Sequence, residues 1–195
     1  MTSSDLVLVT GASGFIAQHT IVRLLEAGYR VRGTVRSMAK ADRVRTVIGR
    51  ATDVGDRLEF VEADLNEDAG WAAAVAGCRF VLHMASPLPN KPPKHKDELI
   101  VPARDGALRV LKAAVDEGVD RIVMTSSVAA IVYGHARDGS RQYDESDWTE
   151  ISDEVGAYEQ SKTLAERAAW DYMEGVEGTE FCTINPGLVL GPLLD

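Results

Sequence analysis

The sequence predicts an α/β fold built on a doubly wound parallel sheet, and three observations support this. Short apolar runs alternate along the chain with longer segments of helical periodicity. The apolar runs are continuous in Val, Ile and Leu, as in parallel strands that helices cover on both faces. Regular alternation implies β-α-β units with right-handed crossovers. A length of 195 residues suits one domain with a sizeable core, which we expect to span residues 1–195.

The expected elements follow one order, in which a helix separates each strand from the next. The expected strands are Leu6–Thr10, Arg30–Val35, Leu58–Val61, Arg79–His83, Arg121–Thr125 and Glu180–Asn185. The expected helices are Gly14–Ala27, Ala39–Arg50, Trp71–Ala76, Glu98–Glu117 and Val155–Glu174. Gly28 and Gly118 follow two of these helices, where a glycine is favoured. The loops Pro87–Lys96 and Gly134–Asp147 follow strand ends, where ligands of open α/β sheets bind.

The composition argues against several classes of protein. The sequence has 21 Lys and Arg residues and 30 Asp and Glu residues. The resulting net charge of −9 disfavours nucleic acid as a partner. No apolar run reaches the roughly 18 residues of a membrane span, and the first residues resemble no secretion signal. We therefore expect a soluble cytoplasmic protein without a membrane partner. Cys78 and Cys182 are predicted to be buried free thiols, and no His/Cys/Asp cluster has the spacing of a metal site.

A glycine-rich loop, Thr10-Gly11-Ala12-Ser13-Gly14-Phe15-Ile16-Ala17, joins the first strand to the first helix. Gly11 permits a tight turn, Gly14 lets the backbone approach a pyrophosphate, and the small Ala17 allows close packing of helix on strand. The free N–H groups and positive dipole end of the helix favour phosphate oxygens. The placement indicates a dinucleotide-binding Rossmann fold. The residues expected at the pyrophosphate are Gly11, Ser13, Gly14, Phe15 and Ile16.

The end of the second strand indicates which dinucleotide binds. A carboxylate about 20 residues beyond the glycine loop would accept the ribose hydroxyls of NAD. The sequence has Arg36 at this position, and Lys40 follows one turn later. Because a guanidinium complements a 2′-phosphate, NADP(H) is favoured over NAD, with Arg36 and Lys40 as its ligands.

Residues after the third and fourth strands are expected to contact the rest of the cofactor. Asp64 could accept from the adenine amino group, with Leu65 near the ring, and a helix N-cap is the alternative role of Asp64. The segment Met84-Ala85-Ser86 contains small residues that let the backbone run close to a dinucleotide. His83 is interpreted as a packed residue at a strand end rather than as a catalytic base.

Tyr158 and Lys162 lie four residues apart on a predicted helix, so both project from one face. An ammonium group close to a phenol stabilises the phenolate, so such a tyrosine can donate a proton to a carbonyl oxygen or accept one from an alcohol. Both residues are also expected to contact the cofactor. Ser127 at the end of the fifth strand is the first candidate to hydrogen-bond the substrate oxygen. Ser126 is the second candidate, and we expect it beside the cofactor.

Several segments together resemble the extended short-chain dehydrogenase/reductase family. They are TGASGFIA, HMASP, TSSVAA, YEQSK and INPGLVLGP, and the likeness runs from Leu6 to Pro192. GYRVRGTVRS, VPARDGALRVLKAA and YDESDW resemble the dihydroflavonol-reductase-like branch, which includes cinnamoyl-CoA reductases and microbial aldehyde and ketone reductases. The resemblance implies NADPH, hydride transfer to the carbonyl carbon of a small-molecule substrate, and a Ser-Tyr-Lys triad.

The resemblance also implies individual roles. Tyr158 would be the acid/base, Lys162 would bind the nicotinamide ribose, and Ser127 would orient the substrate oxygen. Pro186-Gly187-Leu188-Val189 resembles the segment that lies along the nicotinamide. Extended members continue beyond NPGLVLGP into a segment that forms much of the substrate pocket, and we expect this chain to lack that segment.

Three other functions stay open at this point. A sugar-nucleotide epimerase or dehydratase and a hydroxysteroid-type dehydrogenase would share the triad. A truncated NADP-binding module would bind the cofactor without catalysis. Helices Glu98–Glu117 and Val155–Glu174 are those that short-chain enzymes often pair between subunits. A homodimer is therefore one alternative, and helix faces that only cover their own sheet are the other.

Overall fold

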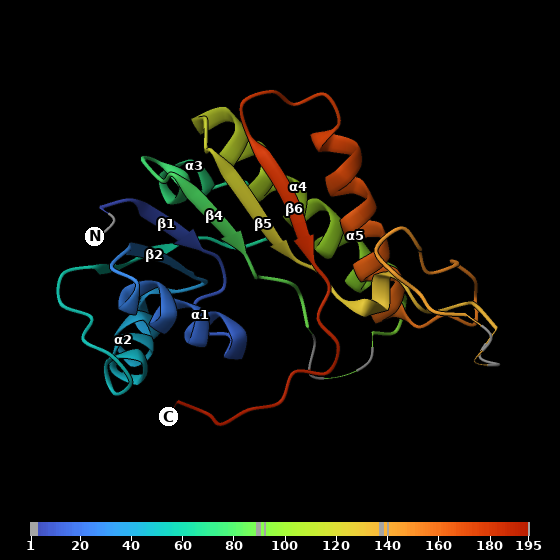
Figure 1. Cartoon of the computed structure of the whole chain (residues 1–195), viewed down its shortest axis with the longest axis horizontal. Coiled ribbons are helices and arrows are strands. Elements are labelled where there is room, and N and C mark those ends of the chain that lie inside the picture. The colour runs from blue at the N-terminus through green and yellow to red at the C-terminus, as the bar shows by residue number, and fades with distance from the viewer. Residues whose placement is uncertain (1–3, 89–90, 92, 137–138, 140, 195) are drawn as a thin grey trace.

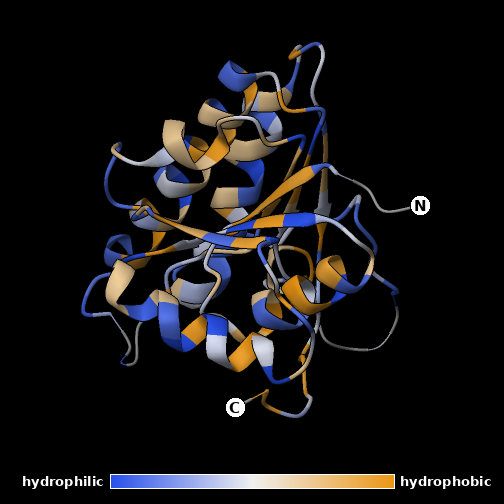
Figure 2. Ribbon diagram, turned by 90° about the vertical axis from the view of Figure 1, so that its left-hand side faces the viewer, coloured by the Kyte–Doolittle hydropathy of each residue, from blue (hydrophilic) through white to orange (hydrophobic). Residues whose placement is uncertain are grey.

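The computed structural model describes residues 4–88, 91, 93–136, 139 and 141–194, and it has the predicted α/β fold. A parallel sheet lies between two layers of helices (Figures 1 and 2). All the predicted strands and helices are present, with small shifts at their ends. In chain order they are β1 (Leu6–Val9), α1 (Phe15–Glu26), β2 (Arg30–Val35), α2 (Ala41–Gly49), β3 (Leu58–Glu62), α3 (Trp71–Val75), β4 (Phe80–His83), α4 (Asp97–Glu117), β5 (Arg121–Thr125), α5 (Ala157–Met173) and β6 (Glu180–Ile184). Short 3-10 turns, η1 (Met38–Lys40) and η2 (Val128–Ala130), follow β2 and β5.

The strand order is β3-β2-β1-β4-β5-β6, and every pairing is parallel. The chain starts in the middle of the sheet, proceeds outward to β3, and then returns to β4 on the other side of β1. The direction of winding reverses between β1 and β4. In such sheets ligands bind at this reversal, outside the carboxyl ends of the strands.

Alternate residues of β1 belong to two separate cores. Val7 and Val9 pack with the buried residues of α1 and α2 on one face. Leu8 packs with the buried residues of α3, α4 and α5 on the other face. Because side chains of a strand alternate between faces, a strand covered on both sides is apolar at every position. Much of the sheet is correspondingly orange in Figure 2, although β2 and β3 also carry charged residues.

The chain after β6 crosses below the carboxyl ends of the strands and runs toward α1 (Figure 1). His19 of α1 hydrogen-bonds the Pro192 carbonyl at 3.0 Å, and Leu194 packs against the core formed with α1 and α2. The segment 185–194 therefore borders the same edge of the sheet as the glycine loop.

The structure bears on three further expectations. No helix in the described part of the chain is long and apolar enough to cross a membrane. Among the same residues, no three His, Cys, Asp or Glu side chains are grouped so that they could hold a metal ion. Cys78 and Cys182 are both free, but only Cys78 is buried. Cys182 is half-buried because β6 is an edge strand.

Candidate active site

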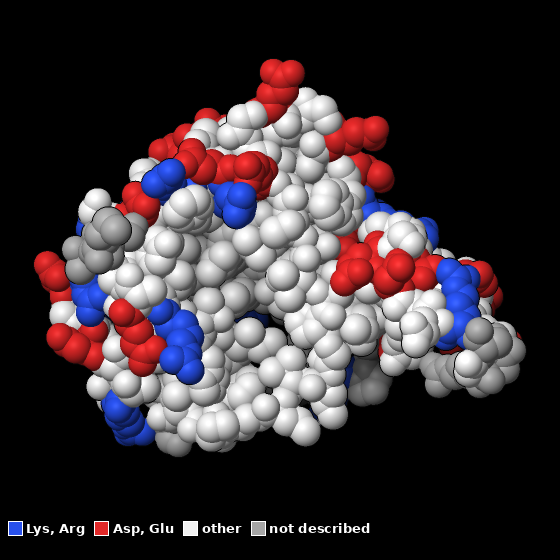
Figure 3. All heavy atoms as spheres, viewed as in Figure 1, with Lys and Arg blue, Asp and Glu red and all other residues white. Residues whose placement is uncertain are grey.

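Two adjoining cavities form one groove along the carboxyl ends of β1, β2, β4 and β5. One cavity, of about 280 Å³, lies toward β2 and β3, and the other, of about 320 Å³, lies toward α5. Gly11, Gly14 and the start of the loop after β4 line both, so the two cavities lie side by side along this edge. In Figure 3 acidic side chains gather at the upper edge and on the loop at the right, whereas the surface around the opening beneath the sheet is largely uncharged.

The glycine loop has the geometry that an anion site requires. Gly11 has a φ of 69°, and a Cβ at this position would lie 3.1 Å from the Cα of Ala85, so both conformation and space favour glycine. Its N–H donates to the Thr34 hydroxyl at 2.9 Å. Gly14 precedes α1, and in this fully described stretch no side chain caps the helix and no acidic residue lies in its first turn. The N-terminus of α1 is thus suited to a phosphate group.

Two cationic side chains lie at the β2 end of the groove. Arg36 and Lys40 line the cavity and are both exposed. Asp64 and Leu65, which follow β3, line the same cavity. This arrangement brings together the residues expected at the adenosine and at a 2′-phosphate.

The alternative role of Asp64 as a helix N-cap is wrong. α3 begins later, at Trp71, and follows Gly70. Asp64 instead accepts the backbone N–H of Asn66 at 2.9 Å, which closes a local Asx turn. Trp71 is 2% exposed and donates its indole N–H to the Asp64 and Glu67 carbonyls, each at 3.1 Å. Trp71 also lines the cavity, and no sequence motif had indicated it.

A buried hydroxyl joins the glycine loop to the end of β4. The Oγ1 atom of Thr10 accepts the N–H groups of Met84 at 3.0 Å and Ala85 at 2.9 Å. It also lies 2.9 Å from Nδ1 of His83. Both lone pairs of the Thr10 hydroxyl oxygen accept these two N–H groups. The hydroxyl hydrogen of Thr10 is therefore donated to Nδ1 of His83. His83 is 2% exposed, and burial lowers its pKa to about 3, so it is a packed, neutral residue as the sequence indicated.

The α5 end of the groove holds the predicted tyrosine and lysine. Both line the cavity near Phe15, Ile16 and Val189. The Nζ atom of Lys162 lies 5.9 Å from the centre of the Tyr158 ring. Tyr158 is 37% exposed, whereas Lys162 is 8% exposed. Burial lowers the pKa of Lys162 to about 8, and the negative charge of Glu166 opposes this shift.

The two candidate serines have different surroundings. Ser126 is buried, and its hydroxyl donates to the Glu166 carboxylate. Ser127 caps η2, and its Oγ accepts the Ala129 N–H at 3.1 Å, which leaves its own hydrogen available for another acceptor. Asn185 donates to the Ser127 carbonyl at 3.2 Å and to Glu166 at 2.9 Å. Glu166 and Asn185 were not among the predicted site residues, because nothing in the sequence shows that they meet.

Most of the predicted site residues line the groove. They are Gly11, Ser13, Gly14, Phe15, Ile16, Arg36, Lys40, Asp64, Leu65, Met84, Ala85, Ser86, Tyr158, Lys162 and Val189. Ser126, Ser127, Pro186 and Gly187 lie outside its walls; the Pro186 carbonyl accepts the Val128 N–H at 3.0 Å. Of the two long loops, the first contributes Pro87 and Leu88. Residues 89–90, 92, 137–138 and 140 of these loops lie outside the described residues.

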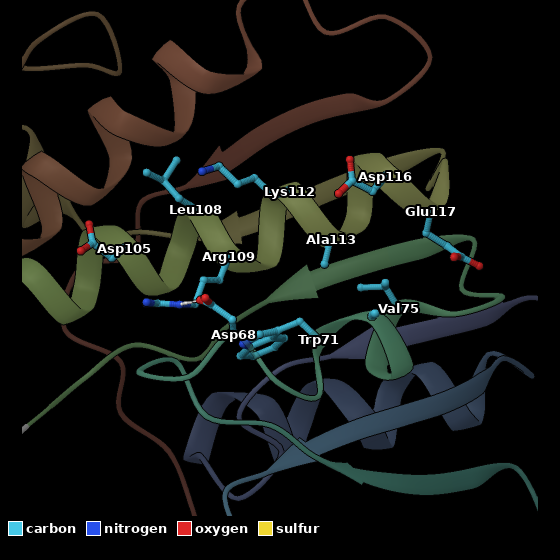
Figure 4. Close-up of a pocket in the computed structure, with 11 residues that line it drawn as sticks. Asp68, Trp71, Val75, Asp105, Leu108, Arg109, Lys112, Ala113, Asp116 and Glu117 are labelled. Carbon is cyan, nitrogen blue, oxygen red and sulfur yellow. Dashed lines mark hydrogen bonds and ion pairs between the residues drawn. The ribbon is translucent and has the colours of Figure 1, made fainter.

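A larger cavity than either of the two that form the groove lies elsewhere. It has a volume of about 570 Å³ and separates α3 from α4 on the outer face of the molecule (Figure 4). An ion pair between Arg109 and Asp68 crosses it, and Trp71 forms part of its wall. Its other charged side chains are of both signs, and the carboxylates of Asp105, Asp116 and Glu117 point in different directions (Figure 4). The groove at the strand ends is therefore the candidate active site.

Comparison with known proteins identifies the family. Residues 7–195 match the model of the NAD dependent epimerase/dehydratase family. The chain belongs to this family. Dihydroflavonol 4-reductase of Arabidopsis thaliana is 37% identical over 202 aligned residues, which cover 100% of this chain and 52% of that protein. A cinnamoyl-CoA reductase of Medicago truncatula is 38% identical, over 100% of this chain and 61% of that protein.

Solved structures agree. The crystal structure of Gre2 from Candida albicans in complex with NADPH matches with a TM-score of 0.87 at 33% identity, over 97% of this chain and 59% of that chain. Vestitone reductase from alfalfa matches with a TM-score of 0.75 at 32% identity, over 92% of this chain and 56% of that chain. These relatives confirm the predicted resemblance to the dihydroflavonol-reductase-like branch. The chain spans little more than half the length of these relatives.

Proposed function

We propose that the chain binds NADPH along the groove and reduces an aldehyde or ketone at the α5 end. The observation that carries this proposal is that the two cavities of the groove share a wall and have different residues at their far ends. One end is lined by Arg36 and Lys40, and the other by Tyr158 and Lys162. An extended dinucleotide with a charged 2′-phosphate at one end and a reactive ring at the other suits such a groove.

The residues at the β1 and β2 ends fit this cofactor. The uncapped N-terminus of α1 would bind the pyrophosphate, and the glycines leave room for the backbone to approach it. Arg36 and Lys40 would bind the 2′-phosphate, and Asp64 would accept from the adenine amino group. The relative with a TM-score of 0.87 was crystallised with NADPH, which supports the same choice.

The residues at the α5 end fit proton transfer. NADPH, when bound, supplies the hydride. Tyr158 would donate its phenolic proton to the carbonyl oxygen, and the Lys162 cation would stabilise the phenolate that remains. The Ser127 hydroxyl would donate to the same oxygen, because the Ala129 N–H contact uses only its oxygen as an acceptor and leaves its hydrogen free to donate.

The exposed apolar side chains near this end favour a substrate with an apolar body. Ile16 is 36% exposed and Val189 is 44% exposed, and both line the cavity beside Tyr158. Leu188 and Leu190 flank Val189 and are 87% and 81% exposed. A carbonyl carried by an aromatic or branched aliphatic group would cover this surface better than a polar sugar would.

Two measurements on the purified chain test the proposal separately. NADPH and NADH are titrated by calorimetry, and we expect tighter binding of NADPH. NADPH oxidation is then followed with a panel of aromatic and branched aliphatic aldehydes and ketones. Equal affinity for the two cofactors would contradict the cofactor assignment. NADPH binding without oxidation by any member of the panel would contradict the reductase assignment and favour a binding module.

A further inference from the structure

Glu166 is a buried carboxylate that the proposed reaction does not use directly. It is 5% exposed and lies one turn after Lys162 on α5. Its Oε2 atom accepts the hydroxyl of Ser126, at the end of β5, and the side-chain amide of Asn185, at the end of β6, at 2.9 Å. Because burying a carboxylate is costly unless its charge is compensated, this position calls for an explanation.

The hydrogen bonds of Glu166 account for part of that compensation. They join three elements, α5, β5 and β6, directly behind the active-site groove. Asn185 also holds the Ser127 carbonyl at 3.2 Å, so Glu166 is connected to the candidate serine through one side chain. Both donors are neutral, however, so neither balances the negative charge.

Lys162 precedes Glu166 by one turn of α5, so the two buried side chains project from the same face of the helix. Lys162 is 8% exposed, and Glu166 is the charged group whose field opposes the effect of burial on it. Tyr158, on the same helix, presents the face of its ring to the ammonium group. His83, on β4, is another titratable group close enough to interact with Lys162: burial, and secondarily the Lys162 charge, lower the pKa of the histidine.

His83 adds no charge to this environment. The two N–H groups that Thr10 accepts oblige its hydroxyl to donate to Nδ1 of His83. A nitrogen that accepts a hydrogen bond carries no proton, so His83 is the neutral tautomer with its proton on Nε2. In the described residues around Lys162, the compensating charge therefore comes from Glu166.

We infer that Glu166 is a positioning residue of this site: its buried carboxylate keeps Lys162 protonated and holds the ends of β5 and β6 against α5. The role of Lys162 in catalysis rests on the proposed function. The effect of Glu166 on the charge of Lys162 is independent of the proposed function, because it is a property of the folded chain alone.

The titration of Lys162 tests this inference without substrate or cofactor. The whole chain is labelled with lysine carrying ¹³C at Cε, and the Lys162 signal is assigned with Lys162→Arg. In Glu166→Gln we expect the midpoint of the Lys162 titration to fall by about one pH unit or more, since an adjacent opposite charge shifts a pKa by about 1–3 units. Glu166→Asp keeps the charge and should recover most of this shift.

The matched control is Asp171→Asn, which removes an exposed carboxylate from the same helix. We expect it to leave the Lys162 midpoint within about 0.3 units of the parent value, as screening by solvent requires. A Glu166→Gln protein that is folded but has an unchanged Lys162 midpoint would overturn the inference. Because the measurement needs no turnover, a chain that shifts as expected but oxidises no NADPH would contradict the proposed function alone.

A double-mutant cycle covers the case in which Glu166→Gln does not fold. If the two residues compensate each other, Lys162→Met should reduce the effect of Glu166→Gln on the folding equilibrium constant by about tenfold or more. It should also restore folding if the single variant is unfolded. A Glu166 that served only as a hydrogen-bond acceptor for Ser126 and Asn185 would give additive effects, or an equally unfolded double variant. Either of these results would overturn the inference.

Discussion

The two ends of the groove are built in different ways. At the end near β1 and β2, backbone N–H groups and exposed cations prevail, and Arg36 and Lys40 are open to solvent. At the α5 end, side chains prevail, and Lys162 and Glu166 are 8% and 5% exposed. The end near β1 and β2 suits a ligand, such as a phosphate group, that is already charged in solution and keeps its charge when bound. The α5 end suits chemistry in which a proton moves, because burial is what makes a neighbouring charge effective.

This difference shows which substitutions should separate binding from catalysis. Changes at the β2 end should alter affinity for the cofactor, and changes at the α5 end should alter the rate. Changes at Thr10, which lies between them, should affect the whole fold.

The largest effect is expected for Tyr158→Phe. Removing the phenolic oxygen removes the proton donor, and the rate of NADPH oxidation should fall by about 1,000-fold, within the range for general acid catalysis. NADPH affinity, measured by calorimetry, should stay within about twofold of the parent value, because the ring remains. Turnover at the parent rate would contradict the assignment of Tyr158 as the acid.

Thr10→Val should be the most destabilising of these changes. Thr10 is 0% exposed, and the substitution keeps its shape but leaves His83 Nδ1 and the N–H groups of Met84 and Ala85 without their partner. We expect the free energy of unfolding to fall by about 3 kcal/mol, measured by urea denaturation. Thr46→Val, at an exposed position of α2, is the matched control and should stay within about 0.5 kcal/mol. Equal effects of the two changes would show that the Thr10 hydroxyl has no special role.

Arg36→Ala should weaken NADPH binding by about tenfold, as expected for the loss of one charge-assisted interaction partly exposed to solvent. NADH, which lacks the 2′-phosphate, should bind as before, so the preference between the cofactors should narrow. Arg50→Ala, at an exposed position after α2, is the control for a general change in charge. Equal losses for NADPH and NADH would place Arg36 away from the 2′-phosphate.

The smallest effect is a pH dependence caused by Lys162. Burial lowers its pKa to about 8, so the lysine is protonated below that pH and neutral above it. The rate of NADPH oxidation should therefore fall as the pH rises through about 8. Stability should change in the opposite sense: the unfolded chain binds the additional proton between about pH 8 and 10.5, so the free energy of unfolding rises with pH there. Lys162→Met should abolish this rise, which denaturation at several pH values would show.

The sequence predicted the fold, and the residues it singled out near β1 and β2 line the groove, because both depend on local patterns. Gly11, Gly14 and Arg36 lie within a short stretch, and the strand before them and the helix between them determine where they point. Asp64 does follow β3 and line the groove, as the sequence predicted, but the alternative role predicted for it was the N-cap of a helix. The structure has an Asx turn instead, because α3 begins only at Trp71. Cys182 was expected to be buried and is half-buried, because no strand in the described chain covers β6 on its outer edge.

The sequence by itself determined the alternation of elements, the glycine loop and the spacing of Tyr158 and Lys162, since each is a property of neighbouring residues. Only the tertiary structure decided which hydroxyl is available, Ser127 or Ser126, and which charge accompanies Lys162. Glu166 meets Ser126 and Asn185 because the parallel strands β5 and β6 end side by side against α5. Such contacts join residues far apart in the chain, and their strength depends on burial, which no local pattern specifies.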